Sequence, residues 1–129
     1  MPVTETPLQS AVFDQLQLAM AANPVAFAEL YRDYLADAWQ CLQMLQESVQ
    51  QVKVETVRAK AHYLRSSSLV VGAHLVARHA AMLEDAAMAS ETRDFSGLLD
   101  NLSKALKAVQ VELAGRLGHG VIPADEPAA

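Results

Sequence analysis

The chain has 129 residues, of which 52% are hydrophobic and 19% are charged, and its formal net charge is −5. This length supports a single domain with a hydrophobic core, and the acidic balance argues against a protein that grips nucleic-acid phosphates through a basic face. A single isoleucine is present and residues 25–122 contain no proline, which excludes an all-β fold and favours an all-α one.

The N-terminal part of the chain predicts a flexible segment and two helices. Residues 1–7 contain two prolines and no periodic pattern, so we expect a flexible N-terminus. Apolar residues spaced near one helical turn predict a short helix over residues 8–21. A long helix over residues 24–50 should follow, because Asn23 is a favourable cap and Pro24 needs no hydrogen-bond donor at the first helical position.

Three more helices are expected in the rest of the chain. The third covers residues 54–71 and ends at a glycine, a residue that commonly terminates helices. The fourth covers residues 73–89, and the last begins at Asp94 or Ser96 and ends at residue 117. Long apolar stripes joined by short connections predict an antiparallel up-down four-helix bundle over residues 8–118, with an additional short N-terminal helix. Residues 119–129 are predicted to form a disordered tail.

The cellular setting follows from what the sequence lacks. No apolar run is long enough to span a membrane, and the N-terminus has no signal-peptide pattern. Cys41 is the one cysteine, which fits a reducing compartment and a buried apolar role. We therefore expect a cytoplasmic protein that binds neither a membrane nor nucleic acid.

The third helix carries an unusual outward face. At 100° per residue, Val57, Ala61, Leu64, Ser68 and Val71 share one side, which we assign to the core. The opposite side carries Arg58, His62, Arg65, Ser66 and Leu69. A neutral imidazole beside cationic side chains is suited to a nucleophile that handles an anion such as a phosphoryl group. The alternative is that His62 is a surface histidine whose charged neighbours only contact water.

The sequence around His62 resembles that of a known family. Residues 61–73 read AHYLRSSSLVVGA and resemble the signature of histidine phosphotransfer (HPt) domains, Ala-His-x-Leu-Lys-Gly-Ser-Ser-x-x-x-Gly-Ala. The resemblance extends as far as Glu84 and covers about 24 residues. It implies an all-α bundle in which His62 accepts a phosphoryl group on its outward ring nitrogen.

The resemblance also suggests roles for the residues that follow His62. Arg65 takes the place of a lysine that helps to hold the phosphoryl group, and Ser67 takes the place of a serine able to form a hydrogen bond near the site. Ser66 departs from the pattern, which has glycine there. The added side chain could reduce transfer, narrow the choice of partner or supply a hydrogen bond.

HPt proteins carry phosphoryl groups between aspartates of receiver domains, from a hybrid sensor kinase to a response regulator. The resemblance therefore implies a phosphoryl carrier rather than an enzyme, monomeric, with no nucleotide site or cofactor of its own, because the partner supplies Mg²⁺ and the aspartate. Docking is assigned to Arg58, Leu69, Phe13 and Leu18, with the alternative that Phe13 lies in the core. Two alternatives are a pseudo-HPt adaptor, motivated by Ser66, and a structural or cofactor-binding bundle, which is disfavoured because inward Glu-x-x-His pairs are lacking.

Overall fold

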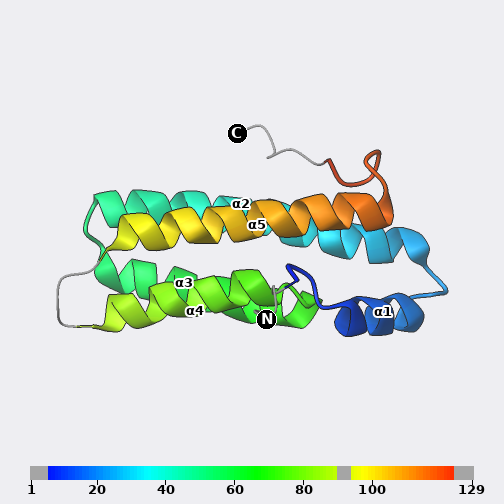
Figure 1. Cartoon of the computed structure of the whole chain (residues 1–129), viewed down its shortest axis with the longest axis horizontal. Coiled ribbons are helices and arrows are strands. Elements are labelled where there is room, and N and C mark those ends of the chain that lie inside the picture. Colours follow the sequence, from blue (N-terminus) through cyan, green and yellow to red (C-terminus); the bar gives the residue numbers. More distant parts are fainter. Residues whose placement is uncertain (1–5, 90–93, 124–129) are drawn as a thin grey trace, which may run out of the picture.

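The computed structural model describes residues 6–89 and 94–123, and all the regular structure within those ranges is helical. The helices are α1 (Ser10–Ala19), α2 (Pro24–Gln50), α3 (Val54–Val71), α4 (His74–Met88) and α5 (Phe95–Leu117) (Figure 1). The all-α prediction is confirmed, and the predicted helix ends agree with the observed ones to within two residues. None of the helices in the described ranges has the length and apolarity that a membrane crossing needs.

Helices α2 to α5 form an antiparallel bundle in two layers. Helices α2 and α5 lie side by side in one layer, and α3 and α4 lie in the other (Figure 1). Each of the four packs against two neighbours, since α3 also contacts α2 and α4 also contacts α5. The short helix α1 lies at the end of the bundle where α3 turns into α4 (Figure 1). This arrangement leaves one long face of α3 open to solvent.

The helix ends follow from local chemistry. The Asn23 side chain accepts a hydrogen bond from the Ala26 amide at 3.1 Å, and Asp94 does the same for the Gly97 amide at 3.1 Å. Gly72 ends α3 with φ = 82°, a left-handed conformation that favours glycine. A Cβ at Gly72 would also lie 2.8 Å from Val12 Cβ, so a side chain there would push α1 away from the α3–α4 turn.

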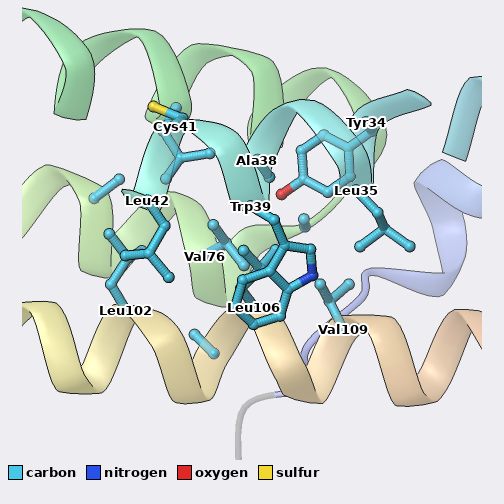
Figure 2. Close-up of a cluster of buried hydrophobic side chains, with 14 of the residues drawn as sticks. Tyr34, Leu35, Ala38, Trp39, Cys41, Leu42, Val76, Leu102, Leu106 and Val109 are labelled. Atoms are coloured by element: carbon cyan, nitrogen blue, oxygen red, sulfur yellow. The ribbon is translucent and has the colours of Figure 1, made fainter. Parts of the chain in front are cut away.

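The core lies between the two layers and is built mainly from the apolar stripes of the four long helices. Figure 2 shows Trp39 and Leu42 of α2 against Leu102 and Leu106 of α5, with Val76 of α4 in the same cluster. These five side chains are at most 9% exposed. Burying one large aliphatic side chain contributes about 1.5–3 kcal/mol, so this packing supplies the rigid support on which the α3 face rests.

The predicted disordered tail is wrong for residues 119–123. Ile122 is fully buried, and the Gln110 side chain donates a hydrogen bond from Nε2 to the Pro123 carbonyl at 2.7 Å. The apolar Ile122 side chain is removed from water against the bundle, which outweighs the glycine-rich composition of the turn. The rest of that prediction, residues 124–129, lies outside the described residues, as do residues 1–5 of the predicted flexible N-terminus.

Candidate functional site

His62 lies midway along α3 with its side chain 59% exposed. Its neighbours on the opposite side of the helix, Ala61 and Leu64, are fully buried. The five residues assigned to the core face from the sequence are all buried: Val57, Ala61, Leu64, Ser68 and Val71. The predicted orientation of α3 is therefore confirmed, and His62 is held at the surface by a helix whose other face is fixed in the core.

Glu84 of α4 fixes the orientation of the imidazole. Its Oε2 atom lies 2.8 Å from Nδ1 of His62, and the Glu84 side chain is only 11% exposed. A carboxylate at this distance accepts a hydrogen bond, so in the neutral ring the proton resides on Nδ1. The lone pair is then on Nε2. The contact selects one tautomer and leaves the second ring nitrogen as a nucleophile.

Arg65 completes a three-residue cluster on α3 and α4. Its Nη1 atom lies 3.3 Å from the other carboxylate oxygen of Glu84, and its side chain is 46% exposed. The guanidinium offsets the cost of holding the Glu84 carboxylate away from water. Because Arg65 is only one turn from His62 and half exposed, it also leaves a positive charge at the surface close to the imidazole.

Arg58 lies one turn before His62 but interacts with its own helix. Its Nη2 and Nε atoms are each 3.2 Å from Oε2 of Glu55. An exposed ion pair of this kind is worth at most about 1 kcal/mol, so a partner can displace Glu55 at little cost. The structure thus keeps Arg58 beside the site without directing it at His62.

The three consecutive serines have different surroundings. Ser66 is exposed and lies one turn after His62 on the same side of α3. The Ser67 hydroxyl donates to the Leu64 carbonyl at 3.2 Å, so this contact ties it to its own helix and does not bring it to the imidazole. Ser68 is buried and forms a hydrogen bond of 2.7 Å with the Tyr34 hydroxyl. Ser66 is the member of this run that the structure places toward the site.

The predicted docking residues divide into two groups. Leu69 and Leu18 are 46% and 79% exposed and remain available to a partner. The assignment of Phe13 is wrong, because its ring is 5% exposed and packs 5.2 Å from Phe27 and 5.5 Å from Tyr31. Helix α1 turns Phe13 toward α2, where an aromatic cluster removes it from water.

The contact of Glu84 with His62 was not predicted from the sequence. Glu84 falls within the buried stripe of α4 formed by Val76, Ala80, Leu83 and Ala87. A carboxylate on an apolar stripe needs a cationic or hydrogen-bonding partner. The position of Glu84 in the sequence therefore indicated that such a partner exists. The partner lies 22 residues away on another helix, so it could not be identified without the packing of α3 against α4.

The functional groups of the site are an imidazole, a carboxylate and a guanidinium. Within residues 6–89 and 94–123, no three His, Cys, Asp or Glu side chains group closely enough to hold a metal ion. The arrangement provides an oriented imidazole, a buried carboxylate and an exposed guanidinium. Together these can accept a phosphoryl group on nitrogen and stabilise its charge.

Comparisons with known proteins concern the family and the fold of the chain. The family model described as Hpt domain matches residues 29–116, a range that includes all of α3 and α4. The crystal structure of histidine-containing phosphotransfer protein B (HptB) from Pseudomonas aeruginosa PAO1 is similar, with a TM-score of 0.80 and 21% sequence identity over 88% of this chain and 96% of that chain. At this identity the likeness establishes the fold alone. No curated protein sequence gave a significant match.

Proposed function

The chain belongs to the Hpt domain family, and on this premise we propose that it is a histidine phosphotransfer protein that carries a phosphoryl group on His62 between receiver-domain aspartates. The donor would be the receiver of a hybrid sensor kinase and the acceptor that of a response regulator. The observation that carries the proposal is the 2.8 Å contact between Nδ1 of His62 and the buried carboxylate of Glu84 on an otherwise exposed imidazole.

The transfer step uses the ring nitrogen that Glu84 leaves free. The Nε2 lone pair of His62 attacks the phosphorus of the receiver's aspartyl phosphate, a nitrogen–phosphorus bond forms, and the bond to the aspartate oxygen breaks. The aspartate leaves with the electron pair as a carboxylate. The ring gains positive charge, which the Glu84 carboxylate stabilises through the proton held on Nδ1. Transfer to the second receiver is the reverse of this step.

The residues around His62 contribute positioning and charge. Phosphoryl transfer depends on in-line geometry and on neutralising the phosphoryl oxygens more than on further covalent chemistry. Arg65 supplies a cation one turn away, and Mg²⁺ bound by the partner receiver would supply further positive charge. Under this proposal the chain acts as a phosphoryl carrier in the cytoplasm, as a monomer, with no nucleotide site or cofactor of its own.

A second candidate function is a pseudo-Hpt adaptor that binds a receiver or a kinase without accepting phosphate. The observation that favours it is Ser66, an exposed side chain one turn from His62 where the family pattern has glycine. A side chain at that point occupies space that a receiver's active site would use. Docking would then persist while in-line approach to Nε2 is hindered.

One experiment separates the two candidates. The chain is mixed with each phosphorylated receiver domain encoded in the same genome, with Mg²⁺, and examined for acid-labile, base-stable label. The carrier proposal expects label on the wild type and none on His62→Gln, whose helicity should be unchanged because the side chain is exposed. Measurable binding to a receiver with no label from any of them would contradict the carrier proposal and support the adaptor.

A further inference from the structure

Three basic side chains lie on α3 around His62, and each has a different environment. Lys60 lines a small pocket next to Cys41 of α2. It precedes His62 by two residues, which corresponds to about 200° around the helix, so it points away from the imidazole. Arg58 and Arg65 lie one turn before and one turn after His62 and share its side of α3. These two arginines are the cations of α3 that can reach a phosphoryl group on the imidazole.

Arg65 is placed beside the ring nitrogen that does not react. Nη1 of Arg65 and Nδ1 of His62 contact the two oxygens of the same carboxylate, at 3.3 Å and 2.8 Å. The two nitrogens of an imidazole point to different sides of the ring, so a phosphoryl group on Nε2 lies away from Glu84. The Glu84 side chain is 11% exposed, and removing Arg65 from it would leave a buried carboxylate with one partner fewer, which is costly. Arg65 is therefore held at Glu84.

Arg58 is held by a much weaker contact. Its Nη2 and Nε atoms both contact Oε2 of Glu55, whose side chain is 82% exposed. An exposed ion pair of this kind exchanges its partner readily, because water and salt screen it. Side chains of a helix lean toward its N-terminus, so the His62 ring lies over the turn that carries Arg58. The four residues between them span about 6 Å along the helix axis, a distance that an arginine side chain can bridge.

We propose, on the premise of the proposed function, that Arg58 holds the phosphoryl group on Nε2 of phosphorylated His62 and that Arg65 stays at Glu84. A phosphoryl group carries up to two negative charges and Glu55 carries one, so the phosphoryl group displaces Glu55 from the guanidinium. The two nitrogens of Arg58 that contact Glu55 then donate to two phosphoryl oxygens, a geometry that suits the planar guanidinium. Arg58 exchanges one exposed partner for another, and the buried part of the site is unchanged.

This assignment differs from the one that the family pattern implies. The pattern has a lysine at position 65, and the resemblance assigns the phosphoryl group to it. Here an arginine stands at that position and contacts Glu84, so the cation for the phosphoryl group comes from the preceding turn. After phosphorylation the Nδ1 proton of His62 still faces Glu84, and Arg65 still occupies the other oxygen of that carboxylate. Arg65 thus fixes the group that orients the ring, and Arg58 stabilises the charge of the phosphoryl group.

The test measures the ionisation of the phosphoryl group, which a purely structural role of Arg58 would not change. His62 is labelled with phosphoramidate, a small phosphoryl donor that needs no docking. The pKa of the phosphoryl group is then measured by ³¹P NMR between about pH 6 and pH 9. Arg58→Gln removes the charge and Arg58→Lys keeps it. Arg65→Gln is the comparison on the other side of His62, and Lys107→Gln, at an exposed position of α5, is the control for net charge.

A nearby cation favours the doubly charged phosphoryl group, so Arg58→Gln is expected to raise the pKa of that group by at least about 0.5 at low salt. Arg58→Lys should retain most of the wild-type value, and Lys107→Gln should leave it unchanged. Arg65→Gln should raise this pKa less than half as much, and it should lower the urea midpoint of the unlabelled protein because Glu84 loses its cationic partner. The effect of Arg58→Gln should shrink at about 0.5 M salt, where charges are screened.

A pKa change in Arg65→Gln as large as that in Arg58→Gln would overturn the inference, because it would place the phosphoryl group equally close to Arg65. So would an unchanged pKa in Arg58→Gln, or equal changes in Arg58→Gln and Lys107→Gln. Failure of the proposed function alone gives a different result: phosphoramidate labels His62 with the expected dependence on Arg58, but no phosphorylated receiver does. A His62 that neither donor labels would overturn both.

Discussion

Two polar networks each join a pair of helices in this protein, and they differ in how much of each network water can reach. Between α2 and α5, Trp39 Nε1 donates to Gln110 Oε1 at 2.6 Å, and Gln110 Nε2 donates to the Pro123 carbonyl at 2.7 Å. Gln110 is only 2% exposed. Between α3 and α4, the network of His62, Glu84 and Arg65 has one buried member and two half-exposed ones.

The comparison separates a stabilising network from a reactive one. In the first, the buried amide of Gln110 uses both its acceptor and its donor on groups of the protein itself, so it holds the C-terminal segment in place and has little left to offer a ligand. In the second, Glu84 occupies one nitrogen of His62 and leaves the other open to a partner. Because the Glu84 carboxylate is buried, the orientation of the imidazole is fixed. Because the ring is exposed, a partner can reach Nε2.

Cys41 is a buried nucleophile, in contrast to the exposed His62. The difference in its reaction rate between the native and the unfolded protein is the largest effect that we predict. Its Sγ donates to the Lys60 carbonyl, and burial raises the pKa of the thiol from 9.0 to about 11. The thiolate fraction at pH 8 then falls about 100-fold, and access is restricted as well. Iodoacetamide should therefore alkylate the native protein at least about 100-fold more slowly than the unfolded chain, measured by mass spectrometry. Similar rates for the two states would contradict the buried assignment.

The same raised pKa of Cys41 makes stability depend on pH in a defined direction. Between about pH 9 and pH 11 the unfolded chain loses the thiol proton while the folded protein retains it. The free energy of unfolding should therefore fall as pH rises through this window. Burial also raises the pKa of Tyr31 to about 12, which adds to the fall above pH 10. The Cys41→Ser variant should show a smaller decrease between pH 9 and pH 10 in urea titrations.

Glu84→Ala should weaken the reactive network without unfolding the bundle. Loss of the carboxylate frees the imidazole to rotate and removes the charge that stabilises the ring during transfer, so labelling by phosphoramidate or by a receiver should slow 10- to 100-fold. Glu84→Gln keeps an acceptor for Nδ1 and should lose less. The contrary result is full activity in Glu84→Ala, which would mean that His62 needs no partner.

Gln110→Ala should lower stability and leave phosphoryl transfer unchanged, the opposite of what we expect for Glu84→Ala. It leaves the Trp39 indole and the Pro123 carbonyl without their partner and opens a small cavity, so the free energy of unfolding should fall by about 2 kcal/mol. Phosphoryl transfer at 25 °C should be unchanged, because His62 lies in the other layer. Urea denaturation followed by Trp39 fluorescence measures the first quantity and single-turnover labelling the second. A transfer defect with unchanged stability would reverse the assignment of the two networks.

Ser66→Gly is the smallest change, and the direction of its effect is informative. If the Ser66 side chain restricts approach to Nε2, the glycine variant should accept phosphate several-fold faster from a receiver and at an unchanged rate from phosphoramidate. Slower transfer from both donors would show instead that the hydroxyl assists. Glycine costs about 1 kcal/mol in a helix interior, so rates are compared at a temperature where both proteins are folded.

Much of the fold and the orientation of α3 could be predicted from the sequence because α3 has a regular apolar pattern. The spacing of Leu64, Ser68 and Val71 was enough to orient the helix and to place His62 and Arg65 outside. Helix ends were predictable where a local cap determines them, as at Asn23 and Gly72. Periodicity is a property of one helix. It predicts features that depend on that helix alone, such as which of its residues are buried.

The errors and omissions concern contacts between elements. The pairing of Glu84 with His62 depends on the register of α4 against α3, which no local pattern specifies. The side of α1 that carries Phe13 was uncertain because both faces of that short helix have apolar residues, and the aromatic cluster with Phe27 decides it. Ile122 follows a glycine-rich turn, so its burial could not be inferred from composition.

The position of the phosphoryl group on the imidazole is the decisive measurement for the proposed role of His62. After transfer to protein labelled with ¹⁵N in its histidines, NMR of the ring nitrogens identifies which nitrogen is bonded to phosphorus. We expect one modified residue, His62, with phosphorus on Nε2 and the proton still on Nδ1 facing Glu84. Phosphorus on Nδ1 of His62, or on His74, His79 or His119, would contradict it.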